Sequence, residues 1–222
     1  MRPSHRTRGA LVAAAASFAT IGAMALPGPA AADSQGSPTA ATARLGVGSR
    51  HLEVRAGHRA AVRGTVEPRR GGMRALLQVR RSWGWKTLDR DRTGAHGRYT
   101  LHRLVRRPMS GNARVVLRSE GHRLHRSLGR LNVYRVAHAS WYGPGLYGNH
   151  LGCGGRLYYG TIGVANKTLP CGTPLTLRHA GRTLRVRVID RGPYVAGREF
   201  DLTAATAQRL RFRGHGRILT TR

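Results

Sequence analysis

Short runs of alternating apolar and polar residues recur over residues 44–135, and glycine-containing turns separate them. The clearest runs cover residues 51–55, 60–66, 75–80, 99–102 and 114–118. Because successive side chains of a strand point to opposite faces, alternation with period two predicts strands, and no helical period competes with it. Regularly spaced short strands joined by glycine turns are typical of a β-sandwich. We therefore predict a β-sandwich for residues 44–135, whose last run, 128–136, leads into a second domain.

Residues 136–222 show a different pattern, which predicts a compact, mostly β domain with one short helix. The runs 174–178 and 183–189 flank a His179-Ala180-Gly181-Arg182 turn and predict a hairpin. In the second run Leu184, Val186 and Val188 share one face, and Arg185 and Arg187 share the other. Thr203 is a suitable N-cap for a helix over residues 204–210, which Gly214 would end. A final strand is expected at 217–220.

The N-terminus has the features of an export signal. Arg2, Arg6 and Arg8 precede a small, apolar stretch at 10–26, and Ala30-Ala31-Ala32 fits the small-residue cleavage pattern. The alternative is a membrane anchor, but the stretch is short and alanine-rich for a span. We predict a signal peptide over 1–32, a flexible linker over 33–43, and a secreted mature protein without a transmembrane span. No cysteine lies near the cleavage point, so lipid attachment there is excluded.

The charge is strongly positive, with 39 Lys and Arg against nine Asp and Glu and a formal net charge of +30. Removing residues 1–32 takes away three arginines and no acid, which leaves about +27. Such a surface attracts polyanions, and for an exported protein these are anionic wall polymers rather than nucleic acid. No basic motif with interleaved aromatic residues indicates nucleic-acid binding. The alternative is a solvated, arginine-rich surface that reflects a GC-rich genome.

The two cysteines, Cys153 and Cys171, lie in the same C-terminal segment. In an exported chain this is most simply one disulfide. A reactive thiol or a metal pair is the alternative, but neither cysteine has a CxxC partner and His150 alone does not complete a zinc site. We expect no metal and no cofactor.

Four motifs of residues 137–221 together resemble the RlpA-like (rare lipoprotein A) double-psi β-barrel, in that family's order and spacing. They are Ala139-Ser140-Trp141-Tyr142-Gly143, the Lys167-Thr168-Leu169-Pro170-Cys171-Gly172-Thr173 stretch, Asp190-Arg191-Gly192-Pro193-Tyr194, and Asp201-Leu202-Thr203 with Ala205 and Ala207. The cysteine pair resembles that of secreted actinobacterial members. Residues 64–99 more loosely resemble bacterial immunoglobulin-like modules. The predicted fold is thus an immunoglobulin-like β-sandwich over 44–135, followed by a double-psi β-barrel over 136–222.

The resemblance implies an activity and a site. Well-studied members are septal lytic transglycosylases that act on peptidoglycan glycan strands, and the same barrel resembles the first domain of expansins, which loosen walls without measurable hydrolysis. The family's catalytic aspartate falls on Asp190. Around it we expect a glycan-binding site made of Trp141, Tyr142, Asn166, Arg191, Tyr194 and Asp201. Two departures from the family pattern stand out: the position of an implicated glutamate is Gly155, and a usual histidine is Asn166.

One carboxylate restricts the chemistry. Inverting or retaining hydrolysis usually needs two carboxyl groups, whereas in lytic cleavage a single residue can be acid first and base later. Glu199 and Asp201 are the remaining acids of this domain, and Asp201, placed before a helix, is more often structural than catalytic. Asp190 also has a structural alternative, as a strand-end acid that binds Arg191 or backbone N–H groups. The leading hypothesis is a secreted lytic transglycosylase that uses Asp190. The alternatives are an expansin-like binding module without catalysis and a basic protein that binds other polyanions.

Overall fold

The computed structural model describes residues 43–119 and 122–222, so the predicted signal peptide and nearly all of the predicted linker lie outside the described residues. The described part is mostly β with one short helix, as predicted. The first strands are β1 (Arg44–His51), β2 (Glu53–Arg55), β3 (His58–Glu67), β4 (Arg74–Arg81), β5 (Gly84–Arg92), β6 (Arg98–Val105) and β7 (Met109–Ser119). No helix among the described residues is long and apolar enough to cross a membrane.

Strands β1 to β7 form two sheets around one hydrophobic core. One sheet has the order β1-β3-β6, and the other joins β5, β4 and β7 to the first half of β8 (His122–Tyr142), which also pairs with β2. Leu101 of β6, Val115 of β7 and Leu131 of β8 are fully buried in this core. The Tyr99 hydroxyl donates to the Gly46 carbonyl at 2.7 Å, and burial raises the pKa of Tyr99 to about 12. The immunoglobulin-like assignment of this region stays a prediction.

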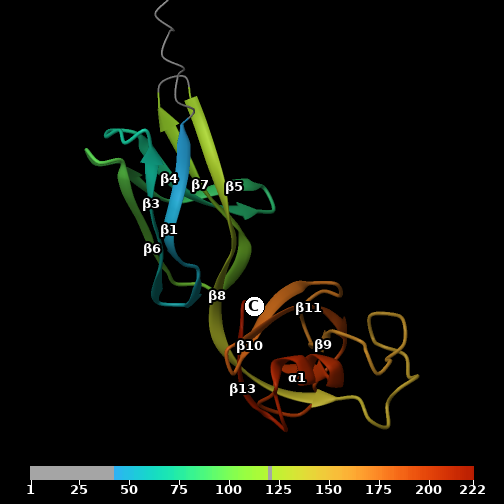
Figure 1. The fold of residues 1–222 in the computed structure, drawn as a ribbon. Coiled ribbons are helices and arrows are strands. Elements are labelled where there is room, and N and C mark those ends of the chain that lie inside the picture. Colours follow the sequence, from blue (N-terminus) through green and yellow to red (C-terminus); the bar gives the residue numbers. More distant parts are fainter. Residues whose placement is uncertain (1–42, 120–121) are drawn as a thin grey trace, which may run out of the picture. The chain divides into compact units, whose positions relative to one another are not determined.

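Strand β8 is continuous over 21 residues and takes part in both the sandwich sheet and the barrel (Figure 1). Its first half pairs antiparallel with β7, and its second half pairs antiparallel with β13 (Gly216–Thr220) and parallel with β12 (Phe200–Thr203). Leu131 and Val133 belong to the first core, whereas Ala137 and Ala139 belong to a second one.

The second core lies inside a closed β-barrel. Its strands are the end of β8 with β9 (Val164–Ala165), β10 (Pro174–His179), β11 (Arg182–Asp190), β12 and β13. They are hydrogen-bonded in the order β12-β9-β11-β10-β13-β8, and β8 also pairs with β12, so that the sheet closes on itself. Val164, Val188 and Leu202 are fully buried in its interior. Closure matters because it leaves no unpaired edge among these strands.

The local turn and helix signals explain the connections within the barrel. In the β10–β11 hairpin His179 pairs with Arg182, and the two turn residues between them, Ala180 and Gly181, both have positive φ, as a tight hairpin requires. The helix α1 (Ala204–Leu210) begins at the predicted Thr203 cap, whose Oγ1 accepts from the Thr206 N–H. The predicted bounds of the helix, 204–210, are confirmed, but the residue that caps its C-terminal end is Arg211 rather than Gly214. Arg211 adopts the left-handed conformation at φ 53°, and its N–H donates to the Gln208 carbonyl.

Candidate active site on the outer face of the barrel

Asp190 reaches the outer face of the barrel because the β11–β9 register shifts just before it. Val186 and Val188 point into the core, and strict alternation would send Asp190 inward as well. Val188 pairs with Val164, however, while Asp190 pairs with the next residue, Ala165. Two residues of β11 therefore stand against one of β9, which is how a bulge re-aims a side chain.

Two backbone N–H groups hold the Asp190 carboxyl group. The N–H of Gly152 donates to Oδ1 at 2.7 Å, and the N–H of Arg191 donates to the same oxygen at 2.8 Å. The Asp190 carbonyl also accepts from the Asn166 N–H at 3.1 Å. Side chain and backbone are thus fixed by three separate segments, which gives the carboxyl group a defined direction.

A second carboxyl group, Asp201, lies on the same face. Ala165 is the register partner of both Asp190 and Asp201, so the two acids lie one strand to either side of β9. At about 4.8 Å per strand spacing, their Cα atoms are roughly 10 Å apart. The register partner of Asp201 on β8 is Ser140, and Tyr142 follows two residues later on the same face. Ser140 was not among the predicted site residues, although its alternation with Tyr142 was a usable signal.

Three buried oxygen atoms of this group have no hydrogen-bond partner within the described residues: Ser140 Oγ, the Tyr142 hydroxyl and Asp201 Oδ1. Unpaired buried polar atoms cost about 1–3 kcal/mol each, so they are uncommon and need a reason. They come from the adjacent strands β8 and β12, and Tyr142 and Asp201 lie close enough to Asp190 for its charge to act on them, so this group can receive polar groups of a ligand.

Burial and neighbouring charge shift two pKa values here. Burial raises the pKa of Asp201, and the negative charge of Asp190 raises it further, while nearby Ser140 and Arg198 act in the opposite direction. Ser140 is close enough to exert this effect, but its Oγ does not meet hydrogen-bond geometry. Burial also raises the pKa of Tyr142, and the charges of Asp190 and Asp201 add to that shift. The surroundings of Asp201 therefore favour its protonated form.

The side chains of Arg191 and Asn166 form hydrogen bonds to the loop and strand ends next to the site. The Arg191 guanidinium donates to the carbonyls of Asn166 at 3.0 Å and Leu169 at 2.8 Å, and no ion pair with Asp190 is found among the described residues. The buried Asn166 amide donates to the Glu199 carbonyl and accepts from the Thr168 and Leu169 N–H groups. Both side chains position the strand ends that carry the acids.

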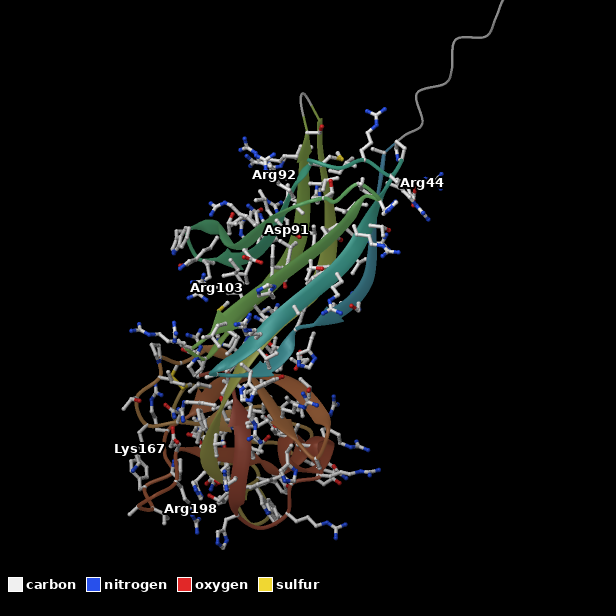
Figure 2. The ribbon with its side chains drawn as sticks, turned by 90° about the vertical axis from the view of Figure 1, so that its left-hand side faces the viewer. Arg44, Asp91, Arg92, Arg103, Lys167 and Arg198 are labelled. Atoms are coloured by element: carbon white, nitrogen blue, oxygen red, sulfur yellow. A yellow bond between two sulfur atoms is a disulfide. The ribbon has the colours of Figure 1, made fainter. Side chains whose placement is uncertain are left out.

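The remaining acid of the barrel, Glu199, is not part of this group. Its carboxylate forms a two-pronged ion pair with Arg135, with contacts of 2.6 and 3.0 Å. Within the described residues Glu67 and Glu199 are the acids in ion pairs, so most of the basic side chains drawn in Figure 2, including the labelled Lys167 and Arg198, have no acidic partner.

Trp141 and Tyr194 are placed differently from Tyr142. Trp141 is the register partner of Leu202, a core residue, so it points to the opposite face of β8 from Ser140 and Tyr142. There it lines a separate cleft beside α1. Tyr194 follows Asp190 by four residues and is 81% exposed. The structure therefore does not gather the three aromatic residues around Asp190.

The predicted disulfide is confirmed: Cys153 and Cys171 are bonded, with Cα atoms 5.5 Å apart. The bond fixes the loop that supplies the Gly152 N–H to Asp190. Gly155 in the same loop has φ +78°, a conformation that L side chains rarely adopt. No group of three His, Cys, Asp or Glu residues in the described part of the chain could hold a metal ion.

The closed barrel, with an outward-facing acid pair at the ends of β11 and β12, defines the class of domain, and comparison with known families agrees. Residues 135–220 match the family described as "Lytic transglycolase", and this part of the chain is an RlpA-like double-psi β-barrel. The resemblance predicted from four motifs is confirmed.

Curated relatives carry the same domain. The chain is 38% identical over 80 residues to "Probable endolytic peptidoglycan transglycosylase RlpA" of Synechocystis sp., covering 35% of the chain and 25% of the relative. It is 40% identical over 79 residues to the protein of that name in Aquifex aeolicus, covering 35% of each. "Endolytic peptidoglycan transglycosylase RlpA" of Campylobacter jejuni is 39% identical over 74 residues, covering 32% of the chain and 27% of the relative. The chain thus spans only a quarter to a third of these relatives.

Proposed function

We propose that this protein cleaves peptidoglycan glycan strands as a lytic transglycosylase and that Asp190 is its general acid and base. The observation that carries the proposal is the pair of carboxyl groups on one barrel face, surrounded by buried oxygen atoms without partners. The names of the relatives support the substrate class, since each is a peptidoglycan transglycosylase.

In the proposed reaction a carboxyl group donates a proton to the glycosidic oxygen as the bond to the anomeric carbon breaks. The 6-hydroxyl of the same sugar attacks that carbon, and its proton passes to the carboxylate that has just formed. One carbon–oxygen bond replaces another, the departing sugar gains the hydrogen, and the enzyme returns to its starting protonation without consuming water. One carboxyl group can serve both steps, which suits a site that lacks the usual glutamate.

Asp201 is the second carboxyl group on this face. Burial and the negative charge of Asp190 raise its pKa, which favours a protonated Asp201 that can donate a hydrogen bond to a bound sugar. Ser140 and Tyr142 then have a role as hydrogen-bond partners for the sugar, which would satisfy their unpaired oxygen atoms.

The remaining proposals concern location and organisation. A signal peptide over 1–32 would export the protein to the cell wall, where the unpaired arginines could hold anionic wall polymers. Residues 44–135 would form a spacer or adhesion domain, and residues 136–222 the catalytic domain.

Product analysis tests the proposed reaction. Purified peptidoglycan is incubated with the wild-type protein or with Asp190→Asn, and soluble products are identified by mass spectrometry. We expect 1,6-anhydro products, lighter by one water than hydrolysis products, from the wild type. Asp190→Asn nearly preserves size but cannot transfer a proton, so release should fall about 10²–10⁴-fold while binding to the wall persists. Hydrolysed, non-anhydro ends would contradict lytic cleavage, and unchanged release by Asp190→Asn would contradict its role.

A second candidate function is expansin-like binding without bond cleavage. The observation that favours it is Gly155, because the implicated glutamate of the family is absent and the φ of +78° disfavours any side chain there. This function predicts that wild type and Asp190→Asn bind peptidoglycan equally well and that neither releases product.

A further inference from the structure

The Trp141 cleft is a cavity on the barrel that the catalytic proposal does not use. We define it by Trp141, Tyr147, Tyr159, Gln208, Arg211 and Arg213, and its volume is about 830 Å³. Its base is the first turns of α1, where Ala204, Ala205 and Ala207 leave room. This volume lies within the range of about 300–1,000 Å³ that small-ligand sites occupy.

Aromatic side chains form one wall of the cleft and remain open to solvent. Trp141 and Tyr147 are each 38% exposed and Tyr159 is 72% exposed, and the two tyrosine rings meet edge to face at 6.1 Å. Exposing aromatic rings forgoes the burial that normally stabilises them, about 25 cal/mol per Å². Flat rings beside a polar rim bind the apolar face of a sugar well, because they cover it while its hydroxyl groups stay wet.

The other wall is polar and cationic. Gln208 contributes an amide, and Arg211 and Arg213 contribute guanidinium groups, while no acid lines the cleft. Arg211 stands where glycine usually ends a helix, and its φ of 53° is strained for a residue with a side chain. Glycine would end the helix without this strain, so helix termination alone does not explain an arginine at position 211, and its side chain lines the cleft. A guanidinium fork matches a carboxylate in geometry and charge.

We propose that the Trp141 cleft is a second glycan-binding site that holds a carboxylate-bearing sugar unit of the peptidoglycan strand. The ring of the sugar stacks on Trp141 and Tyr159, and its carboxylate meets Arg211 and Arg213. The cleft lies on the opposite face of β8 from Ser140 and Tyr142, so the unit it holds is not the one that is cleaved. This inference rests on the proposed function for its substrate, but not on turnover.

Binding of two matched glycans to the full chain tests this site. One is an oligosaccharide of alternating N-acetylglucosamine and N-acetylmuramic acid without peptides, and the other is a chitooligosaccharide of the same length, which lacks the carboxylates. Dissociation constants are measured by calorimetry in the Asp190→Asn background so that no cleavage intervenes. We expect the carboxylated strand to bind about tenfold more tightly, since it alone can form charge-assisted hydrogen bonds with the guanidinium groups. Equal affinities would overturn the proposal.

Four variants locate the binding. Tyr159→Ala should weaken both glycans about tenfold, whereas Tyr158→Ala, an exposed neighbour outside the cleft, should weaken neither. Arg213→Gln should remove the preference for the carboxylated strand, while Arg209→Gln, which removes the same charge on the last turn of α1, should leave it intact. Equal losses for the cleft variants and their controls would show general charge or surface effects and overturn the site.

Arg211→Gly separates ligand binding from structural support. Glycine relieves the strained φ, so the midpoint of thermal unfolding should rise while the preference for the carboxylated strand falls. A variant that keeps the full preference would remove Arg211 from the site. Tighter binding of a uronic-acid oligosaccharide than of the muramic-acid strand would also overturn the assignment of the ligand. If these binding tests fail while anhydro products are still released, only the proposal of a second glycan-binding site is refuted. If the binding tests succeed but no anhydro products are released, only the proposed lytic activity is refuted.

Discussion

Removing the disulfide should destabilise the barrel and disturb the candidate site together. Cys153 and Cys171 are 18 residues apart in the sequence. In the chain-entropy model a closed loop of that length restricts the unfolded chain by an amount worth about 3 kcal/mol at 25 °C. The doubly substituted protein, Cys153→Ser with Cys171→Ser, should therefore unfold with a free energy lower by about that amount.

The functional effect follows from the contacts of the same loop. Gly152 donates to Asp190 Oδ1, and the Cys153 N–H donates to the Ile189 carbonyl at 3.3 Å. A loop released at Cys153 holds these donors less firmly, so the rate of product release should fall even under conditions where the barrel remains folded.

Equilibrium denaturation in guanidinium chloride measures the change. Replacing Trp83 and Trp85 by phenylalanine in both proteins leaves Trp141 as a fluorescent reporter inside the barrel region. Reductant should lower the transition midpoint of the protein with both cysteines and leave the serine variant unchanged. Two outcomes would refute the reasoning: equal unfolding free energies, or a reductant effect of the same size in both proteins.

Three further predictions concern single residues. Because the folded-state pKa of Asp201 is raised, its proton is bound more tightly in the folded protein, and its charge destabilises the fold above that pKa. Asp201→Asn should thus unfold at a higher temperature than wild type near pH 7, and the difference should shrink as the pH falls toward about 4. A difference in unfolding temperature that grows on acidification would contradict this prediction. Gly155→Glu should lower stability by about 1–3 kcal/mol, because φ is +78° there, and should not raise product release; a more active variant would show that the lost glutamate can be restored. Thr203→Val keeps the shape but removes the cap on Thr206, so chemical denaturation should show a loss of about 1–2 kcal/mol, and no loss would mean the cap is dispensable.

The barrel strands were largely predictable because their signals are local. The β10–β11 hairpin follows from a Gly-containing turn between alternating runs, and the start of α1 follows from Thr203. The run at 51–55, by contrast, was expected to be one strand. Strand β1 instead ends at His51, and β2 begins at Glu53 in the other sheet. The alternation of apolar and polar residues continues unchanged where the chain passes from one sheet to the other. Only the pairing with distant strands reveals this change of sheet.

The site was predictable in its main acid but not in its composition. Asp190 was identifiable from its motif. Strict alternation along β11 would have predicted an inward side chain, and the register shift between β11 and β9 turns it outward. Trp141 and Tyr142 were grouped as aromatic residues of one motif, although adjacent residues of a strand face opposite sides. The C-terminal cap of α1 was missed because a left-handed arginine, Arg211, rather than Gly214, satisfies the last carbonyls.

Because strand β8 is continuous, insertions and deletions near its middle are restricted in length. Side chains of Leu131 and Val133 enter one core, those of Ala137 and Ala139 enter another, and the spacing between them is an even number of residues along one backbone. An insertion of one residue near Arg135 would carry Ser140 and Tyr142 to the interior side, unless a bulge absorbed it. Natural variation in length at this junction should therefore come in steps of two residues.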